Sequence, residues 1–237
     1  MPAEIQRPRT ELILALIAMA AAGISPNIFV AAQAGYDSMS DLALTFLIPS
    51  LVVMGLIIGI SVLLRLHTLR RQIFIGIAGG VLATVAMEVV RETGYHLGGM
   101  PGDLPKLLGV LLMDRFAMGP SLLSNVVGWS YHFWNGAAFG IIFSLVFGRT
   151  AWWAGVFYAV VIAIIFMSSP AVVAMGVGRF GVDFGPGFAA TVLAAHLAYG
   201  LVLGWYVHGR NSQPHLWKRI QLAIGNQNNM SLEGDVR

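Results

Sequence analysis

Long apolar stretches separated by short polar segments run along most of the chain. They cover residues 12–32, 42–64, 72–95, 121–147, 151–175 and 188–207. Each is close to the twenty or so apolar residues with which an α-helix crosses a bilayer. The pattern therefore predicts an all-α fold, a polytopic membrane helix bundle. Residues 1–210 would form one transmembrane domain with six transmembrane helices.

The segment between the third and fourth stretches, residues 97–120, is not a plain polar loop. Its apolar part, residues 107–113, is too short to cross a membrane. Asp103 followed by Leu104 and Pro105 is typical of an N-cap with proline in the first helical turn. We therefore expect a short interfacial or re-entrant helix between transmembrane helices 3 and 4.

Prolines interrupt two of the stretches. Pro26 lies inside the first and Pro170 follows Ser168 and Ser169 in the fifth, and both predict kinks. Residues 1–10 are polar and, with Arg7 and Arg9, resemble the start of a signal peptide. Because the apolar stretch that follows reaches spanning length, we expect a first transmembrane helix instead.

The remaining residues, 211–237, form a polar tail. Within it Leu216, Trp217, Ile220 and Ile224 recur at helical spacing beside Lys218. This pattern is typical of a short amphipathic helix lying on a membrane surface. We expect the tail to be cytoplasmic.

The composition supports an integral membrane protein. Of the 237 residues, 57% are hydrophobic and 11% charged, and the mean hydropathy is +0.76. Without cysteine, disulfides, thiolate catalysis and cysteine-ligated metal centres are excluded. The net charge of +3 comes from scattered residues with no basic run, so we expect no nucleic-acid partner.

Basic residues near the ends of the stretches predict the orientation. Three fall on one side of the predicted bundle (Lys106, Arg115, Arg179) and nine on the side shared by both termini (Arg7, Arg9, Arg65, Arg70, Arg71, Arg149, Arg210, Lys218, Arg219). Because cytoplasmic loops carry the excess of lysine and arginine, both termini should be cytoplasmic.

The candidate site starts from a motif that occurs twice. His132 is followed by Gly136 and Gly140, and His196 by Gly200 and Gly204, all four residues apart. This spacing places each histidine and its glycines on one helical face. The third stretch carries Glu88, Glu92 and His96, also four apart.

Depths along the helices predict that these groups meet. With a rise of about 1.5 Å per residue, His132 lies roughly 16 Å, His196 roughly 14 Å and Glu88 roughly 10 Å below the outer ends of their helices. All three would then share the outer half of the membrane. Ionisable side chains inside a membrane are costly, so they mark a candidate functional site.

Imidazole and carboxylate groups together suit a divalent transition metal, namely zinc, iron or copper. We expect His132, His196, Glu88 and Glu92 as ligands of a centre that could be redox-active. The hydrogen-bonding partners would be Asn135, Tyr131 and Tyr199. Alternatively, flat space over the glycines could hold haem b between His132 and His196.

Other interpretations stay open. Small residues four apart are the usual device of close helix packing in membranes, and a membrane histidine often only bonds to a neighbouring helix. Glu88 could pair with Arg91. The protein could also be a homo-oligomer or an accessory subunit of a larger membrane complex without chemistry of its own, or a proton-coupled carrier with Glu88 as the proton site.

Two segments resemble a known group of proteins. His196 to Gly204 resembles the closing helix of small uncharacterised bacterial polytopic membrane proteins, and residues 100–109 resemble a connection in the same group. Together they cover about a third of the chain. The resemblance implies a helical bundle in the bacterial inner membrane and no assigned activity.

Overall fold

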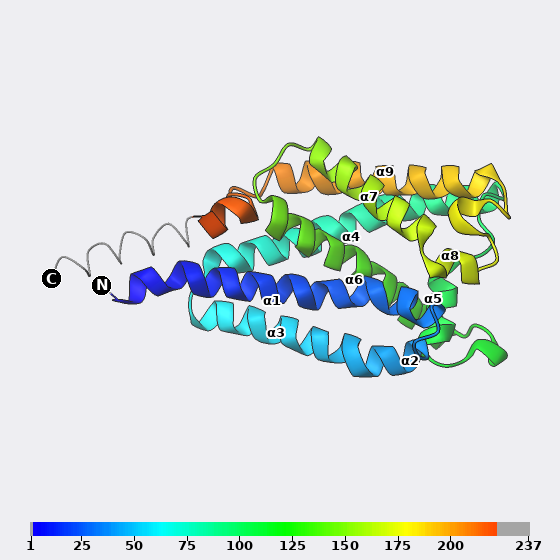
Figure 1. The fold of residues 1–237 in the computed structure, drawn as a ribbon, viewed down its shortest axis with the longest axis horizontal. Helices are drawn as coiled ribbons and strands as arrows, with labels where there is room; N and C mark the ends of the chain where they lie inside the picture. Colours follow the sequence, from blue (N-terminus) through cyan, green and yellow to red (C-terminus); the bar gives the residue numbers. More distant parts are fainter. Residues whose placement is uncertain (1, 222–237) are drawn as a thin grey trace.

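The computed structural model describes residues 2–221, and within this range the chain forms helices and no strands. Six longer helices run roughly along one axis of the bundle (Figure 1): α1 (Pro2–Gln33), α3 (Ile48–Leu63), α4 (His67–His96), α6 (Leu122–Phe147), α7 (Trp153–Ser168) and α9 (Pro186–His208). Shorter elements connect them: α2 (Met39–Leu42), the π-helix η1 (Ala43–Leu47), α5 (Leu104–Leu112), the 3₁₀ helices η2 (Phe116–Met118) and η3 (Arg179–Gly181), and α8 (Pro170–Ala174). The all-helical expectation is confirmed.

Four segments in the described part of the chain are long and apolar enough to cross a membrane. They are Arg9–Gln33, Met39–Leu63, His67–His96 and Pro186–His208. The helix α7 is apolar but shorter. The helix α6 is long enough, but it carries polar side chains such as His132 and Asn135. These four helices support a polytopic membrane protein.

Two of the three sequence-predicted local features are found where they were expected. The helix α5 begins after Asp103, whose side chain accepts a hydrogen bond from the backbone N–H of Lys106 at 3.4 Å. The chain is also broken before Pro170, because Ser169 adopts the extended backbone that a following proline favours. The helix α1 runs through Pro26 without a break, and the kink expected there stays a prediction.

The first part of the tail returns to the bundle. The helix α9 ends at the end of the bundle where α1 begins (Figure 1). Beyond it, the Asn211 amide donates to the Ser144 carbonyl at 3.0 Å, and the Arg219 guanidinium donates to Gln72 Oε1 at 2.9 Å. Residues 216–221 are helical, as predicted, whereas Ile224 lies outside the described residues.

The glycines of the doubled motif lie in backbone contact with two neighbouring helices. A Cβ on Gly76 or Gly80 of α4 would collide with the backbone of α6 near Gly140 and Gly136. In the same way, Gly155 of α7 lies against Gly200 and Gly204 of α9. Both glycine faces of the doubled motif are therefore covered by a neighbouring helix, as in ordinary close packing of membrane helices.

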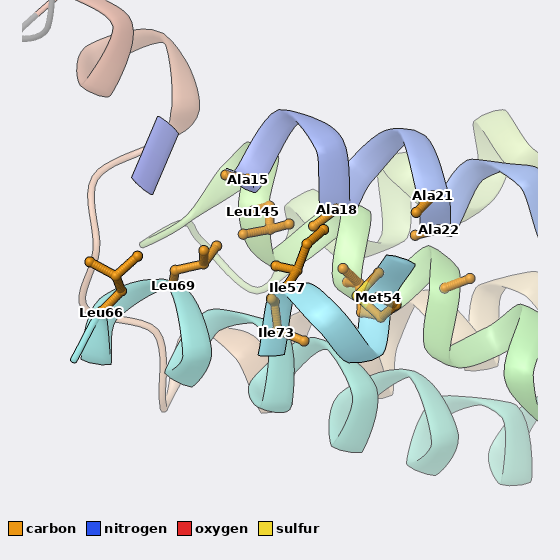
Figure 2. Close-up of a cluster of buried hydrophobic side chains, with 12 residues drawn as sticks. Ala15, Ala18, Ala21, Ala22, Met54, Ile57, Leu66, Leu69, Ile73 and Leu145 are labelled. Atoms are coloured by element: carbon orange, nitrogen blue, oxygen red, sulfur yellow. The ribbon is translucent and has the colours of Figure 1, made fainter. Parts of the chain in front are cut away.

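A cluster of buried apolar side chains fills one half of the bundle, between α1, α3, α4 and α6 (Figure 2). Small residues of α1, such as Ala15 and Ala18, face Met54 and Ile57 of α3 and Ile73 of α4. The polar residues discussed next lie in the other half, toward α5. The buried ion pair thus lies away from this apolar cluster.

Candidate functional site

A buried ion pair with a histidine lies between α4 and α6. The Arg91 guanidinium donates from Nε and Nη2 to both oxygens of Glu88, at 2.9 and 2.7 Å. His132 Nε2 donates to Glu88 Oε1 at 2.9 Å. All three residues are buried, with Arg91 only 4% exposed. Glu88 and Arg91 lie three residues apart along α4, which places both on one helical face.

Further charges surround Arg91 on its outer side. Its Nη2 donates to Glu92 Oε2 at 3.1 Å and lies 3.8 Å from Asp103 Oδ1. Asp103 in turn binds the Lys106 ammonium at 3.1 Å, and this hydrogen bond raises the pKa of Lys106. Glu92 also pairs with His96 at 3.3 Å. These groups lie around an open hollow that Glu88 lines as well.

On its inner side the ion pair borders a cavity of about 360 Å³. The cavity lies between α1, α4, α5, α6, α7 and α9, and most of its wall is apolar. Arg91 and His132 face it from α4 and α6, and His196 from α9. Buried cavities with mostly apolar walls and a few polar groups are the usual form of small-molecule sites.

Two polar atoms in this wall have no hydrogen-bond partner. They are Nη1 of Arg91 and Oγ of Ser169, and each belongs to a residue more than nine-tenths buried. Both residues line the cavity. Because buried donors are almost always satisfied in proteins, the pair calls for an explanation. Both atoms are hydrogen-bond donors in residues that line the cavity.

His196 lines the same cavity, and two contacts hold its ring. Its Nδ1 donates to the Val192 carbonyl at 2.8 Å, so a neutral ring keeps Nε2 as an acceptor. The Phe166 ring stacks on it, with centroids 6.4 Å apart and planes at 25°. These two contacts fix the ring in the wall.

Asn135, Tyr131 and Tyr199, the residues expected to bond to the site's histidines, instead connect the helices around the cavity. Asn135 Oδ1 accepts a hydrogen bond from the Ser25 hydroxyl of α1. The Tyr131 hydroxyl donates to the Ser25 carbonyl at 2.6 Å, and the Tyr199 hydroxyl donates to the Gly136 carbonyl at 2.7 Å. Tyr131 and Tyr199 therefore join α6 to α1 and to α9.

The predicted ligand set is brought together only in part. His132 meets Glu88, and His196 lines the same cavity as His132, whereas Glu92 faces the outer hollow. Among residues 2–221, no group of three or more histidine, aspartate or glutamate side chains is arranged to hold a metal ion. The Arg91 cation already occupies the Glu88 carboxylate. Metal binding and haem binding stay predictions, and the space expected for a porphyrin over the glycines is filled by α4 and α7.

Sequence reasoning missed the roles of Arg91 and Ser169. The sequence predicts Arg91 only as a partner for Glu88, although an arginine within an apolar helix is itself a signal of a buried polar site. For Ser169 it predicts only a proline kink. The residue lines the cavity at the backbone break before Pro170.

Residues 70–218 match the model of DUF6789, a family of unknown function. The match covers more than half of the chain, so the protein belongs to this family. This agrees with the resemblance to an uncharacterised family over part of the chain. The matched range runs from the start of α4 to Lys218 and includes Glu88, Arg91 and both cavity histidines. No curated protein and no solved structure matches the chain.

Proposed function

We propose that this protein is a membrane protein that binds a lipid-soluble small molecule in the cavity between α1, α4, α6 and α9. The observation that carries the proposal is the pair of buried, unpartnered polar atoms, Arg91 Nη1 and Ser169 Oγ, in a mostly apolar cavity wall. An unmade hydrogen bond at a buried donor costs about 1–3 kcal/mol. A ligand oxygen near these atoms would remove that cost.

The way into the cavity supports a ligand that arrives from the bilayer. Asn27 of α1 and Ile165 of α7 both line the cavity and are exposed, Ile165 by 63%. The helices α1 and α7 make almost no contact with each other. The entrance that we propose lies between these two helices, on the side of the bundle where lipid chains would lie.

The topology we propose has six spans. The helix α6 forms one of them, and α7 and α8 together form another, which is broken before Pro170. In this arrangement both termini are cytoplasmic, in agreement with the distribution of basic residues. The site then lies in the outer half of the bacterial inner membrane. Burying an arginine–glutamate pair at that depth costs free energy, so such a pair marks a functional site.

A matched pair of variants tests the proposal. Ala195 is 3% exposed and lines the cavity, so Ala195→Phe fills it, whereas Ala194→Phe changes an exposed neighbour on the same helix. Protein purified from membranes in mild detergent is extracted with organic solvent, and the extract is analysed by mass spectrometry. We expect a co-purified amphipathic molecule in the wild type and in Ala194→Phe but not in Ala195→Phe. Identical extracts from both variants, with both proteins folded, would contradict the proposal.

A further inference from the structure

The polar groups around the cavity narrow the chemistry of its ligand. This inference rests on the proposed function and adds the class of ligand. We propose that the cavity binds a quinone and its quinol form, because its wall combines hydrogen-bond donors, acceptors such as a histidine nitrogen, and a hydrogen-bonded link to the outer surface.

The charges near Arg91 disfavour an anionic ligand. Arg91 and Lys106 bring two positive charges, and Glu88, Glu92 and Asp103 bring three negative ones. The cluster therefore has an excess of one negative charge when its histidines are neutral. A carboxylate or phosphate head group would add to this excess, whereas an uncharged carbonyl oxygen can accept from Arg91 Nη1 without doing so.

Donors and an acceptor lie on different elements of the wall. Arg91 Nη1 on α4 and the Ser169 hydroxyl before α8 can donate to carbonyl oxygens. His196 on α9 offers Nε2 as an acceptor, because Nδ1 is committed to the Val192 carbonyl. A quinone presents two oxygens that only accept, and its quinol presents hydroxyls that also donate. The wall can bind both forms.

The apolar part of the wall suits a ring with a hydrocarbon tail. Aromatic and aliphatic side chains line the cavity, among them Phe139, Phe166 and Met87. The entrance proposed between α1 and α7 would let a tail extend into the bilayer. A ligand of this kind would place its ring near the buried donors and its tail among lipid chains.

A hydrogen-bonded link leads from the cavity to the outer end of the bundle. His132 lines the cavity and donates to Glu88, and Glu88 lines the outer hollow together with Glu92. A quinone and its quinol differ by two protons as well as two electrons. A ligand bound beside His132 would therefore lie at one end of this link, and this chain would bind both redox forms without transferring electrons.

Titrations with soluble probes test the class of ligand. The full chain in detergent micelles is titrated by calorimetry with decylubiquinone, decylubiquinol, laurate and decanol. We expect saturable binding of decylubiquinone and decylubiquinol. Ser169→Ala should weaken both by about fivefold, as expected for one hydrogen bond, and the control Ala194→Phe should weaken neither.

His196→Phe provides the sharper test, because phenylalanine keeps a ring against Phe166 and removes the acceptor nitrogen. We expect about fivefold weaker binding of decylubiquinol and unchanged binding of decylubiquinone. Equal weakening of both forms would overturn the role of His196 as the acceptor for quinol. If laurate or decanol binds in a Ser169-dependent way and decylubiquinone does not, the quinone inference fails and the lipid-soluble ligand stands. If no probe binds and no molecule co-purifies, both fail.

Discussion

Replacing Glu88 with glutamine removes the carboxylate at the centre of the buried polar cluster. Glutamine keeps one oxygen that can accept from His132, but it cannot neutralise Arg91, which is 4% exposed. The remaining carboxylates are Glu92 Oε2 at 3.1 Å and Asp103 Oδ1 at 3.8 Å from Arg91 Nη2. Breaking a buried ion pair by removing one partner costs about 3–5 kcal/mol. We expect a loss of stability in this range.

The matched control is Glu92→Gln, one turn further along α4. The Glu92 side chain is 43% exposed, so solvent screens its pairing with Arg91 and its loss should cost about 0–1 kcal/mol. Unfolding of the purified protein by dodecyl sulfate, followed by circular dichroism, measures both. A double change, Glu88→Gln with Arg91→Gln, should be less destabilising than Glu88→Gln alone, because it leaves no unpaired buried charge. Equal stability losses for Glu88→Gln and Glu92→Gln would refute the reasoning.

Three further predictions concern other parts of the molecule. Gly80→Ala should destabilise the bundle by about 1–3 kcal/mol, because the new Cβ would overlap the α6 backbone. Gly59 has open space around it, so Gly59→Ala should be neutral or slightly stabilising, and thermal unfolding compares the two variants. Elemental analysis of the wild type and of the His132→Ala, His196→Ala double variant tests the metal hypothesis; because Arg91 occupies the Glu88 carboxylate, we expect the same metal content in both, and metal lost in the variant would support metal binding. Asn211→Ala removes two hydrogen bonds to α6 oxygens, so limited proteolysis after residue 211 should be faster than in the wild type, and unchanged cleavage would contradict this role of the tail.

Periodicity predicts the helices well because burial in a membrane demands long apolar stretches. The N-cap at Asp103 and the break before Pro170 were also predictable, since each depends on local chemistry. In the doubled motif each histidine and its glycines do face a neighbouring helix, but the glycines serve close helix packing and leave no space for a ligand. Sequence spacing along one helix cannot say which neighbouring helix covers that face.

The site was harder to predict because it depends on contacts between distant segments. Glu88 meets His132 across 44 positions of sequence, as the depth argument suggested. The pairing of Arg91 with Glu88 was open to sequence reasoning, because the two residues lie three apart on one helical face. The position of Ser169 in the cavity wall depends on the backbone break before Pro170, and the hydrophobic pattern does not predict how the chain turns there.

A density map of the protein in lipid nanodiscs, at a resolution that shows side chains, tests the central claim most directly. We predict a bound elongated molecule in the cavity, with an oxygen within hydrogen-bond distance of Arg91 Nη1 or Ser169 Oγ and a tail leaving between α1 and α7. A cavity that contains only water, or one closed by a new partner for Arg91 Nη1 from the protein itself, would contradict the account.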